Sequence, residues 1–375
     1  MALVKTYKML SITITHGEGS YVWDTAGKRY LDMYAGHAVV STGHAHPQVV
    51  AAITEQAKRL VFYSNVVDLE VRRAATEKLL SYAPKGITSV LFANSGAEAI
   101  ENALKMAVLQ TGRKQLIAFE GGFHGRTLLS TNVTGTSKYR QYAPYQLSDI
   151  IICAFADIAS IRARINSNTA AVILEGVQSM AGCRIAPSEF YQELRELTSQ
   201  YGAYLIYDEV QTGIGRTGTM FFAGRFGVVP DIICLAKGIA SGIPLSAILV
   251  SQAVADKVQY GEYGATFGAG PIAMAAMLAT LEVIEREQLL ARVESVGAFL
   301  RTALQKLPAI EEVRGLGFLL GVKTAQPASE LQRKLLECGV IVGTSDDSTV
   351  IRLLPPLVLQ KHEAEEFINI LRECL

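Results

Sequence analysis

Two short apolar runs in the sequence end next to residues with reactive side chains. Residues 203–207 are followed by Asp208 and Glu209, and residues 232–235 are followed, after one alanine, by Lys237. Ligands of open α/β sheets bind beyond the carboxyl ends of the strands, so Asp208 and Lys237 are expected at one rim. A lysine amine forms a Schiff base with an aldehyde, and a carboxylate keeps a pyridinium nitrogen protonated, which suggests pyridoxal phosphate (PLP). Taken alone, the two residues fit an ordinary turn carboxylate and a surface lysine at least as well.

A candidate phosphate site lies at the segment Asn94-Ser95-Gly96-Ala97-Glu98, which follows a strand-like run and opens an alanine-rich helix. Free backbone N–H groups and the positive end of the helix dipole favour an anion at such a junction. Gly96 lets the backbone approach a ligand closely. The alternative is a plain helix start with Ser95 as its N-cap.

The segment Gly122-Phe123-His124-Gly125-Arg126-Thr127 follows another strand-like run. An aromatic ring at the end of a strand can stack on a flat cofactor, and an arginine can hold a carboxylate in fork geometry. Phe123 and Arg126 are therefore candidate cofactor and substrate contacts. A core phenylalanine and a solvated arginine are the alternative.

Two further polar residues stand in segments that suggest ligand contacts. Arg352 has apolar neighbours and precedes Pro355-Pro356, and a buried arginine needs an anionic partner. We interpret it as a clamp for a substrate carboxylate, with an internal salt bridge as the alternative. Thr266 lies in the glycine-rich segment 264–268, where its hydroxyl can add a phosphate contact.

Two other motifs suggest different chemistry, and their surroundings argue against both. Residues 213–218 spell GxGxxG, but a dinucleotide site requires a helix directly after the strand, and none is indicated there. A flexible loop near the active centre fits these glycines better. His44 and His46 invite a metal interpretation, but zinc needs at least three protein ligands and no third is nearby. Turn histidines are the expectation, and no metal is predicted.

The composition is that of a compact globular protein. The chain has 375 residues, of which 50% are hydrophobic and 19% charged, and its formal net charge is zero. No global field therefore favours nucleic acid or an anionic membrane. The five cysteines show no CxxC spacing, and residues 1–8 carry no signal-peptide pattern. A cytoplasmic protein with reduced thiols is expected.

The elements that must position these residues follow an α/β pattern. Near-continuous apolar runs, typical of strands buried on both faces, predict seven strands at 89–93, 115–119, 150–154, 170–174, 203–207, 232–235 and 246–250. Helical stretches such as 189–200 separate several of them, which predicts a mostly parallel sheet. Short antiparallel strands are expected within residues 7–32. We predict a large domain at 46–265 and a smaller α+β domain built from 1–45 and 266–375.

Seven motifs together resemble those of the class III (ornithine-type) PLP-dependent aminotransferases, most closely the acetylornithine/succinylornithine aminotransferase group. The resemblance extends from about residue 17 to 356 and implies the type I fold of PLP-dependent transferases. The motifs are YLDMYAG with GHAHP, FANSGAEAIENALK, GGFHGRT, LIYDEVQTGIGRTG, LAKGIASGIPL, GATFGAGP and RLLPPL.

The resemblance implies a role for each matching residue. Lys237 would be the PLP-linked lysine that shuttles the proton, and Asp208 would pair with the pyridine nitrogen. The other implied cofactor residues are Phe123 and Val210 on the ring faces, Gln211 at the ring hydroxyl, Gly96 and Ala97 at the phosphate, Glu209, and Thr266 from the neighbouring subunit of a homodimer.

The implied reaction is transfer of the terminal amine of an Nα-acylated ornithine to 2-oxoglutarate, in arginine biosynthesis. Arg126, with Ala265 beside it, would take the carboxylate of the acylornithine. Arg352 would take the α-carboxylate of 2-oxoglutarate or glutamate.

Two segments depart from the family pattern. The family usually has EPxQGEGG where this chain has residues 175–182, so that Met180 replaces a glutamate that masks the clamp arginine. An uncharged Met180 leaves Arg352 unmasked in both half-reactions, which favours a donor with a second carboxylate such as Nα-succinylornithine. Residues 268–270 also replace the family's Gly-Gly-Asn beside the phosphate.

Three alternatives stay open at this point. One is another PLP reaction on the same scaffold, with ornithine, GABA or a carrier-linked lysine as substrate, or a racemase or decarboxylase activity. A second is an NAD-dependent oxidoreductase that uses the glycines of 213–218. A third, a binding scaffold without activity, conflicts with the presence of both Lys237 and Asp208.

Overall fold

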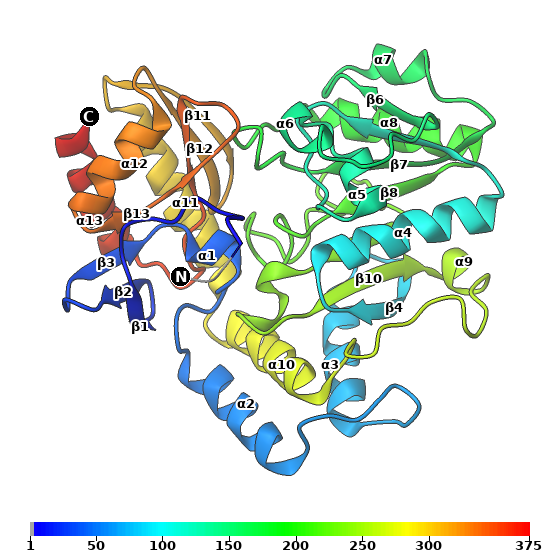
Figure 1. The fold of residues 1–375 in the computed structure, drawn as a ribbon, viewed down its shortest axis with the longest axis horizontal. Helices are drawn as coiled ribbons and strands as arrows, with labels where there is room; N and C mark the ends of the chain where they lie inside the picture. Colours follow the sequence, from blue (N-terminus) through cyan, green and yellow to red (C-terminus); the bar gives the residue numbers. More distant parts are fainter. Residues whose placement is uncertain (1–3) are drawn as a thin grey trace.

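A seven-stranded sheet forms the centre of the larger lobe in the computed structural model, which describes residues 4–375 (Figure 1). Its strands, in spatial order, are β4 (Ile87–Ala93), β10 (Ser246–Ser251), β9 (Ile232–Leu235), β8 (Tyr204–Asp208), β7 (Thr169–Glu175), β5 (Gln115–Phe119) and β6 (Ile150–Cys153). Only β10 runs opposite to the other six. The sequence predicts all seven strands to within two residues, and the predicted mostly parallel α/β sheet is confirmed.

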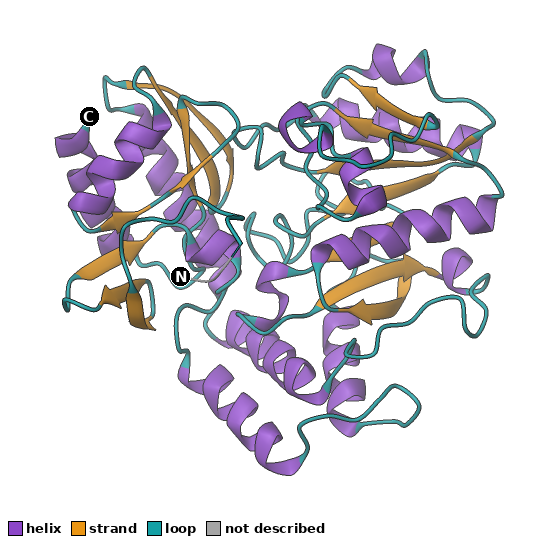
Figure 2. Ribbon diagram, in the orientation of Figure 1, coloured by secondary structure: helices purple, strands orange, loops and turns teal. Residues whose placement is uncertain are grey.

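Helices cover both faces of this sheet, as Figure 2 shows. Alternate residues of the inner strands enter different clusters, because successive side chains of a strand point to opposite faces. Ile206 packs with the cluster that includes α4, whereas Leu205 packs with the one that includes α8. The helices of this lobe are α2 (Pro47–Arg59), α3 (Glu70–Ser81), α4 (Gly96–Thr111), α5 (Leu128–Val133), α6 (Ser137–Arg140), α7 (Ile158–Arg162), α8 (Ser188–Tyr201), α9 (Gln252–Ala255) and the 3-10 turn η1 (Lys237–Ala240).

The smaller lobe brings both ends of the chain together (Figure 1). One of its sheets has the order β1 (Ile14–Glu18), β2 (Tyr21–Asp24), β3 (Arg29–Asp32) and β13 (Val340–Ile341), and the other has β11 (Ile310–Leu316), β12 (Leu319–Thr324), β15 (Val350–Leu353) and β14 (Gly343–Thr344). Helices α1 (Ala35–Ala38), α11 (Leu289–Gln305), α12 (Ala328–Glu337) and α13 (Lys361–Cys374) complete it. The two-residue strands β13 and β14 have no sequence signal of their own.

Helix α10 (Pro271–Arg286) connects the two lobes and packs against α2, α3 and η1. Eleven of its residues are buried, which explains its nearly continuous apolar sequence. The predicted domain limits, which assign residues 266–375 to the small domain, stay a prediction, and residues 1–3 of that domain lie outside the described residues.

The GxGxxG segment forms consecutive turns and no helix. It is buried rather than loose: Arg216 is 2% exposed and its guanidinium donates to the carbonyls of Phe318 and Pro355 in the smaller lobe. Burial lowers the pKa of Arg216 to about 9. The segment therefore ties the two lobes together, which corrects the expectation of a flexible loop.

His44 and His46 each pair with a carboxylate. Nε2 of His44 lies 2.8 Å from Oδ2 of Asp32, and Nε2 of His46 lies 3.1 Å from Oε1 of Glu287. Within residues 4–375, no three His, Cys, Asp or Glu side chains are arranged to hold a metal ion. In the same range, no helix is both long and apolar enough to cross a membrane.

Candidate active site

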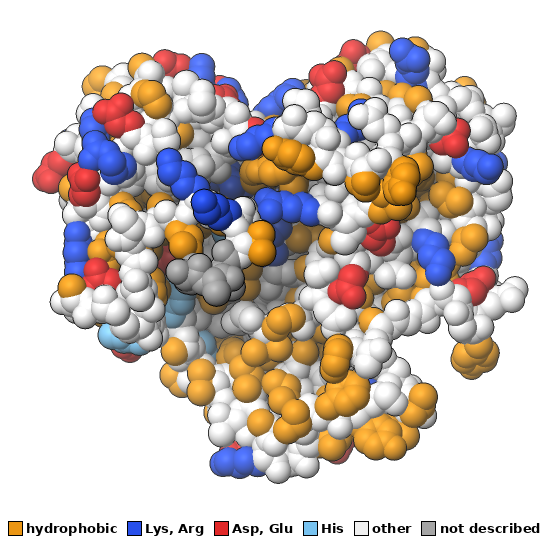
Figure 3. All heavy atoms as spheres, in the orientation of Figure 1, with side chains coloured by type: hydrophobic (Ala, Val, Ile, Leu, Met, Phe, Trp, Pro, Cys, Tyr) orange, Lys and Arg blue, Asp and Glu red, His pale blue; other side chains and the backbone are white. Residues whose placement is uncertain are grey.

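A cavity of about 350 Å³ lies where the strands of the large sheet end. Figure 3 shows basic side chains gathered around the hollow between the lobes. The residues that line the cavity are Val39, Asn94, Ser95, Gly96, Ala97, Phe123, His124, Gly125, Glu175, Met180, Asp208, Val210, Gln211, Ala236, Lys237, Gly242, Ile243, Pro244 and Leu245. Seven predicted site residues therefore come together: Gly96, Ala97, Phe123, Asp208, Val210, Gln211 and Lys237.

Asp208 is the last residue of β8 and is 4% exposed. Its Oδ1 accepts a hydrogen bond from the Val210 N–H at 3.0 Å, and its Oδ2 lies 2.7 Å from Nδ1 of His124. Both bonds fix the carboxylate at the end of its strand. His124 is not among the predicted site residues, although it lies in the same segment as Phe123.

Lys237 begins η1 directly after β9, with a φ of 39°. Backbone strain of this kind persists where the surrounding structure enforces it, commonly at active sites. The lysine amine is buried, and burial lowers its pKa to about 8, against the opposing effect of the nearby Asp208 and Glu175 carboxylates. A much larger share of neutral amine is therefore present near neutral pH than at a surface lysine.

Glu175, the last residue of β7, adds a second carboxylate to the cavity. Its Oε1 accepts a hydrogen bond from the Phe123 N–H at 2.9 Å and so holds that segment in place. Burial and the neighbouring Asp208 raise the pKa of Glu175 to about 7. Glu175 is also not among the predicted site residues, although its position at the end of a strand was a signal for such a role.

The start of α4 provides a cradle of backbone donors. Ser95 and Glu98 form a capping box, in which Ser95 Oγ accepts from the Glu98 N–H at 3.2 Å. The N–H groups of Gly96 and Ala97, at the first two helical positions, have no carbonyl one turn earlier to bond. A Cβ on Gly96 would come 3.0 Å from Val210 Cγ1, so a side chain here would be crowded.

Arg352 is 2% exposed and has neutral partners. Its guanidinium donates to Ser179 Oγ at 2.8 Å, the Thr344 carbonyl at 2.7 Å and the Tyr34 hydroxyl at 3.1 Å. Within residues 4–375, Arg352 forms no ion pair with a carboxylate. An internal salt bridge, the predicted alternative, therefore does not hold the Arg352 guanidinium in place.

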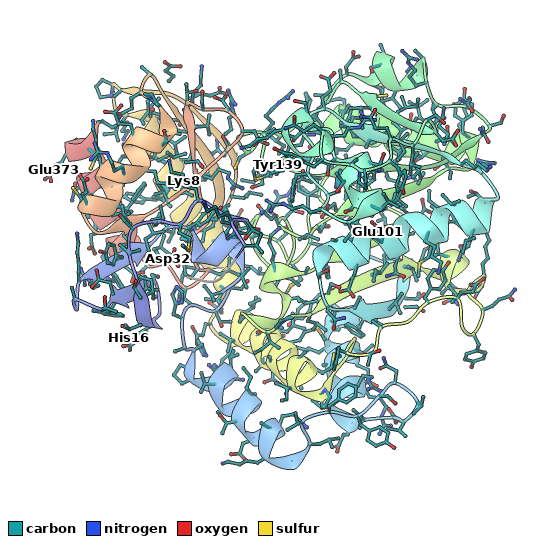
Figure 4. All side chains as sticks on the ribbon, in the orientation of Figure 1. Lys8, His16, Asp32, Glu101, Tyr139 and Glu373 are labelled. Atoms are coloured by element: carbon teal, nitrogen blue, oxygen red, sulfur yellow. The ribbon has the colours of Figure 1, made fainter. Side chains whose placement is uncertain are left out.

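Arg126 lies at the other side of the hollow and is exposed. Its guanidinium stacks over the rings of Tyr7 and Tyr139, 5.1 and 5.3 Å from their centroids. Figure 4 labels Tyr139 on the larger lobe and Lys8, the neighbour of Tyr7, on the facing N-terminal segment. The N-terminal segment thus reaches across the hollow to Arg126.

Five predicted site residues do not line the cavity: the two arginines just described, and Glu209, Ala265 and Thr266. Glu209 is buried beneath it, where it accepts hydrogen bonds from the N–H groups of Phe222 and Ala223, and burial raises its pKa to about 7. We therefore assign Glu209 to the support of its loop. Ala265 and Thr266 lie on a separate loop, and Thr266 is exposed.

Comparison with known proteins identifies the family. The sequence profile of the family described as aminotransferase class-III matches residues 2–375. The chain belongs to the class-III aminotransferases. Acetylornithine aminotransferase of Archaeoglobus fulgidus is 40% identical over 369 residues, which cover 98% of this chain and 97% of the relative. Acetylornithine aminotransferase 1 of Bordetella bronchiseptica is 40% identical over 382 residues, which cover 99% of this chain and 96% of the relative.

Solved structures share the whole fold of this aminotransferase. A transaminase from Virgibacillus has a TM-score of 0.93 at 26% identity and covers 99% of this chain and 94% of its own. Ornithine aminotransferase of Toxoplasma gondii has a TM-score of 0.93 at 30% identity, covers 100% of this chain and 91% of its own, and holds PLP at partial occupancy in its active site. The predicted type I fold is thus confirmed, and the enzyme is PLP-dependent.

The residues of the cavity fit this cofactor. A carboxylate at the floor matches a protonated pyridine nitrogen, a buried lysine matches an aldehyde, and a helix N-terminus matches a phosphate. Oε1 of Gln211 is buried and has no hydrogen-bond partner among the described residues. A ring hydroxyl is a donor that would satisfy it.

Proposed function

We propose that this aminotransferase moves the terminal amine of an Nα-acylated ornithine to 2-oxoglutarate, giving the semialdehyde and glutamate, in arginine biosynthesis. The observation that carries the proposal is the presence of two arginines, Arg126 and Arg352, beside one cavity that contains Lys237. The positive charges of all three act on the same side chain, His37. Relatives at 40% identity, named acetylornithine aminotransferases, support the same substrate class.

The chemistry divides between the cofactor and the chain. PLP, when bound, supplies an aldehyde that condenses with amines and a ring that withdraws an electron pair. Lys237 would hold the cofactor, and its neutral Nζ would be the group that moves a proton at the substrate carbon. Asp208, fixed by His124, would keep the ring nitrogen protonated. Phe123 and Val210 would confine the ring, and Gly96 and Ala97 would bind the phosphate.

The two arginines define which substrates fit. Arg352 takes the α-carboxylate of 2-oxoglutarate, and Arg126 takes the carboxylate of the acylornithine. We also propose that Ala265 lines the same end of the site. Because Met180 carries no charge and Arg352 has neutral partners, Arg352 stays available while the donor is bound. A donor with a second carboxylate, such as Nα-succinylornithine, therefore gains an ion pair that Nα-acetylornithine lacks.

We also propose a homodimer in which Thr266 contacts the phosphate bound by the partner subunit. Thr266 is exposed and does not line the cavity of its own chain. Hydrophobic side chains gather on the same face, below the hollow (Figure 3). The large exposed ones on the neighbouring segments include Val61, Phe62, Tyr63, Val66 and Phe267. Such a patch is typical of an interface rather than of free surface.

A substrate panel tests the proposal. The PLP-loaded enzyme is assayed with Nα-acetylornithine, Nα-succinylornithine, ornithine, GABA and Nε-acetyllysine, with 2-oxoglutarate as acceptor. The proposal expects the highest kcat/KM for an Nα-acylornithine, and succinyl above acetyl. A preference for ornithine, GABA or acetyllysine would contradict it.

The five free cysteines also support the cytoplasmic location that we include in this proposal.

A further inference from the structure

The segment that precedes Val39, a residue that lines the cavity, contains an unusual left-handed turn. Residues Ala35, Gly36, His37 and Ala38, which form α1, have φ angles of 48°, 54°, 72° and 65°. Left-handed backbone is unfavourable for residues with a Cβ, and three of these four have one. The fold therefore has to hold this turn in place.

The Asp32 carboxylate braces the turn. Its Oδ1 accepts hydrogen bonds from the N–H groups of Tyr34 at 2.9 Å and Ala35 at 2.8 Å, while its Oδ2 contacts His44. Gly343 leaves room for the Tyr34 ring, since a Cβ there would lie 2.1 Å from Tyr34 Cε2. Strain that the surrounding structure maintains in this way points to a function for the side chains on the turn.

His37 lies in the middle of a wall of rings that joins the two arginines. Its ring centroid is 4.9 Å from that of Tyr34 and 6.0 Å from that of Tyr7. Tyr34 in turn lies under the Arg352 guanidinium at 5.7 Å, and Tyr7 lies under Arg126 at 5.1 Å. A ligand with carboxylates on both arginines would therefore lie along this wall, with its central part opposite His37.

The charge state of His37 suits recognition of a neutral polar group. His37 is exposed to the hollow's solvent, but desolvation by its neighbours and the positive charges of Arg352, Lys237 and Arg126 lower the pKa of its imidazole. A neutral imidazole has one N–H donor and one acceptor nitrogen, which can bond an amide. The surrounding cations also disfavour the protonated α-amine of free ornithine, which acylation removes.

We propose that His37 is a specificity-determining residue that hydrogen-bonds the acyl amide of the amino donor. This inference rests on the proposed function, because it assumes an Nα-acylated donor. Asp32 is then a positioning residue that acts through the turn. Together they give the site its preference for acylated over free ornithine.

Two variants separate the hydrogen bond from the ring. His37→Phe keeps an aromatic ring and loses the polar atoms, whereas His37→Asn keeps a donor and an acceptor on a residue that tolerates left-handed backbone. His16→Phe is the matched control, since His16 stacks on Trp23 in the smaller lobe, away from the hollow (Figure 4). Calorimetry on the PLP-loaded enzyme measures binding of two probes without an amine: Nα-acetylnorvaline, which has the amide, and glutarate, which does not.

His37→Phe is expected to weaken acetylnorvaline binding roughly tenfold and to leave glutarate binding within about twofold, as one lost hydrogen bond predicts. The ratio of kcat/KM for Nα-acetylornithine over ornithine falls by a similar factor, and His37→Asn recovers part of it. Equal weakening of the binding of both probes, or no change in the binding of either, would overturn the inference. Turnover of an Nα-acylornithine by the wild-type enzyme would still uphold the proposed function. Failure of the wild-type enzyme to use an Nα-acylornithine would overturn both.

A second, independent feature joins two helices of the smaller lobe. Cys338 follows α12 and Cys374 ends α13, and their sulfur atoms lie 3.7 Å apart. Cys338 is exposed, whereas Cys374 is buried. Burial and the contact with Cys338 raise the pKa of Cys374 to about 11. The exposed thiol is therefore the one that a reagent reaches first.

We infer that this pair is a site of thiol–disulfide exchange. The Cys338 thiolate attacks a small-molecule disulfide such as cystamine, forms a mixed disulfide and releases one thiol. The Cys374 thiolate then attacks Cys338 Sγ and releases the second thiol. The protons from both cysteines end on the released thiols, and the reagent gains the two electrons that the cysteine pair loses. The new disulfide bond links the end of α12 to the end of α13.

Peptide mapping of the cystamine-treated holoenzyme tests this second inference. A crosslinked Cys338–Cys374 peptide, an intact mass lower by two hydrogen atoms and a higher melting temperature are expected. The crosslink is absent in Cys338→Ser and Cys374→Ser and present in the control Cys153→Ser. A persistent cystamine adduct on Cys338 without the crosslink, or a crosslink between chains, would overturn it.

Discussion

Nδ1 of His124 and Oδ2 of Asp208 lie 2.7 Å apart at the floor of the cavity, and both side chains are almost fully buried. His124 lies in the loop after β5 and Asp208 is the last residue of β8, so the sheet itself sets their distance. A buried carboxylate that is held at one oxygen by imidazole and at the other by a backbone N–H cannot turn away. The site therefore presents Asp208 in one fixed orientation.

Removal of the imidazole is expected to weaken cofactor binding. In His124→Leu, Asp208 loses a charge-assisted hydrogen bond of about 1.5–3 kcal/mol, so the dissociation constant of PLP rises about 10- to 100-fold. Equilibrium titration of the cofactor-free protein with PLP, followed by absorbance, measures this. His16→Leu, a change outside the cavity, is the control. An unchanged dissociation constant of PLP in His124→Leu would mean that His124 does not position Asp208.

Removal of the charge of Asp208 is expected to affect turnover more than substrate binding. Asp208→Asn keeps the shape of the side chain, but a neutral amide no longer stabilises a protonated ring nitrogen. We expect kcat to fall by about 10²- to 10³-fold, in line with the loss of one preorganised electrostatic group. Single-turnover kinetics on enzyme with verified PLP content measure the effect. A kcat within threefold of wild type would contradict the assignment.

A carboxylate beside Arg352 is expected to mask it. Met180 lines the cavity next to Ser179, which bonds the guanidinium. Met180→Glu should therefore raise KM for 2-oxoglutarate and for Nα-succinylornithine about tenfold, the effect of a competing ion pair of about 1.4 kcal/mol, and change KM for Nα-acetylornithine less. Met180→Gln, of equal size without charge, is the control. A similar rise in KM in both variants would indicate a steric effect instead.

Glu209 is expected to make the stability of the cofactor-free protein depend on pH. Burial raises its pKa to about 7, whereas the carboxyl of an unfolded chain titrates near about 4.3. The stability contributed by the neutral carboxyl is thus complete below the unfolded value and is lost as the pH rises through about 7.

Urea unfolding at pH 5 and pH 7.5 measures this effect of Glu209. The midpoint for wild type is expected to fall between the two pH values by more than that for Glu209→Gln, which cannot titrate. Glu196→Gln, an exposed glutamate on α8, should behave as wild type. Identical pH slopes for wild type and Glu209→Gln would contradict the buried neutral carboxyl.

The fold was largely predictable because its inner strands are buried on both faces. Runs such as 232–235 have no polar residue, and turn residues or helices bound them, so their limits are clear in the sequence. The strands β13 and β14 were not predictable, because two residues carry no periodic pattern. β13 pairs with β3, which lies far away in the chain, whereas β14 pairs with the nearby β15.

The site was predictable where a residue lies at the end of an apolar strand, as Asp208 and Lys237 do. His37 and Tyr34 were missed, because a left-handed turn of residues other than glycine has no sequence signature. A signal for the orientation of Glu209 was available, because neighbouring side chains at the end of a strand point in opposite directions. Asp208 faces the cavity, and Glu209 therefore points into the loop below.

The central claim is that Lys237 carries the cofactor, and borohydride reduction tests it most directly. The PLP-loaded enzyme is reduced, digested and mapped by mass spectrometry, with Lys237→Arg as the control. We predict one pyridoxyl-labelled peptide, with the label on Lys237, and none in the variant. A label on any other lysine, or reduced enzyme without a label at Lys237, would contradict the account.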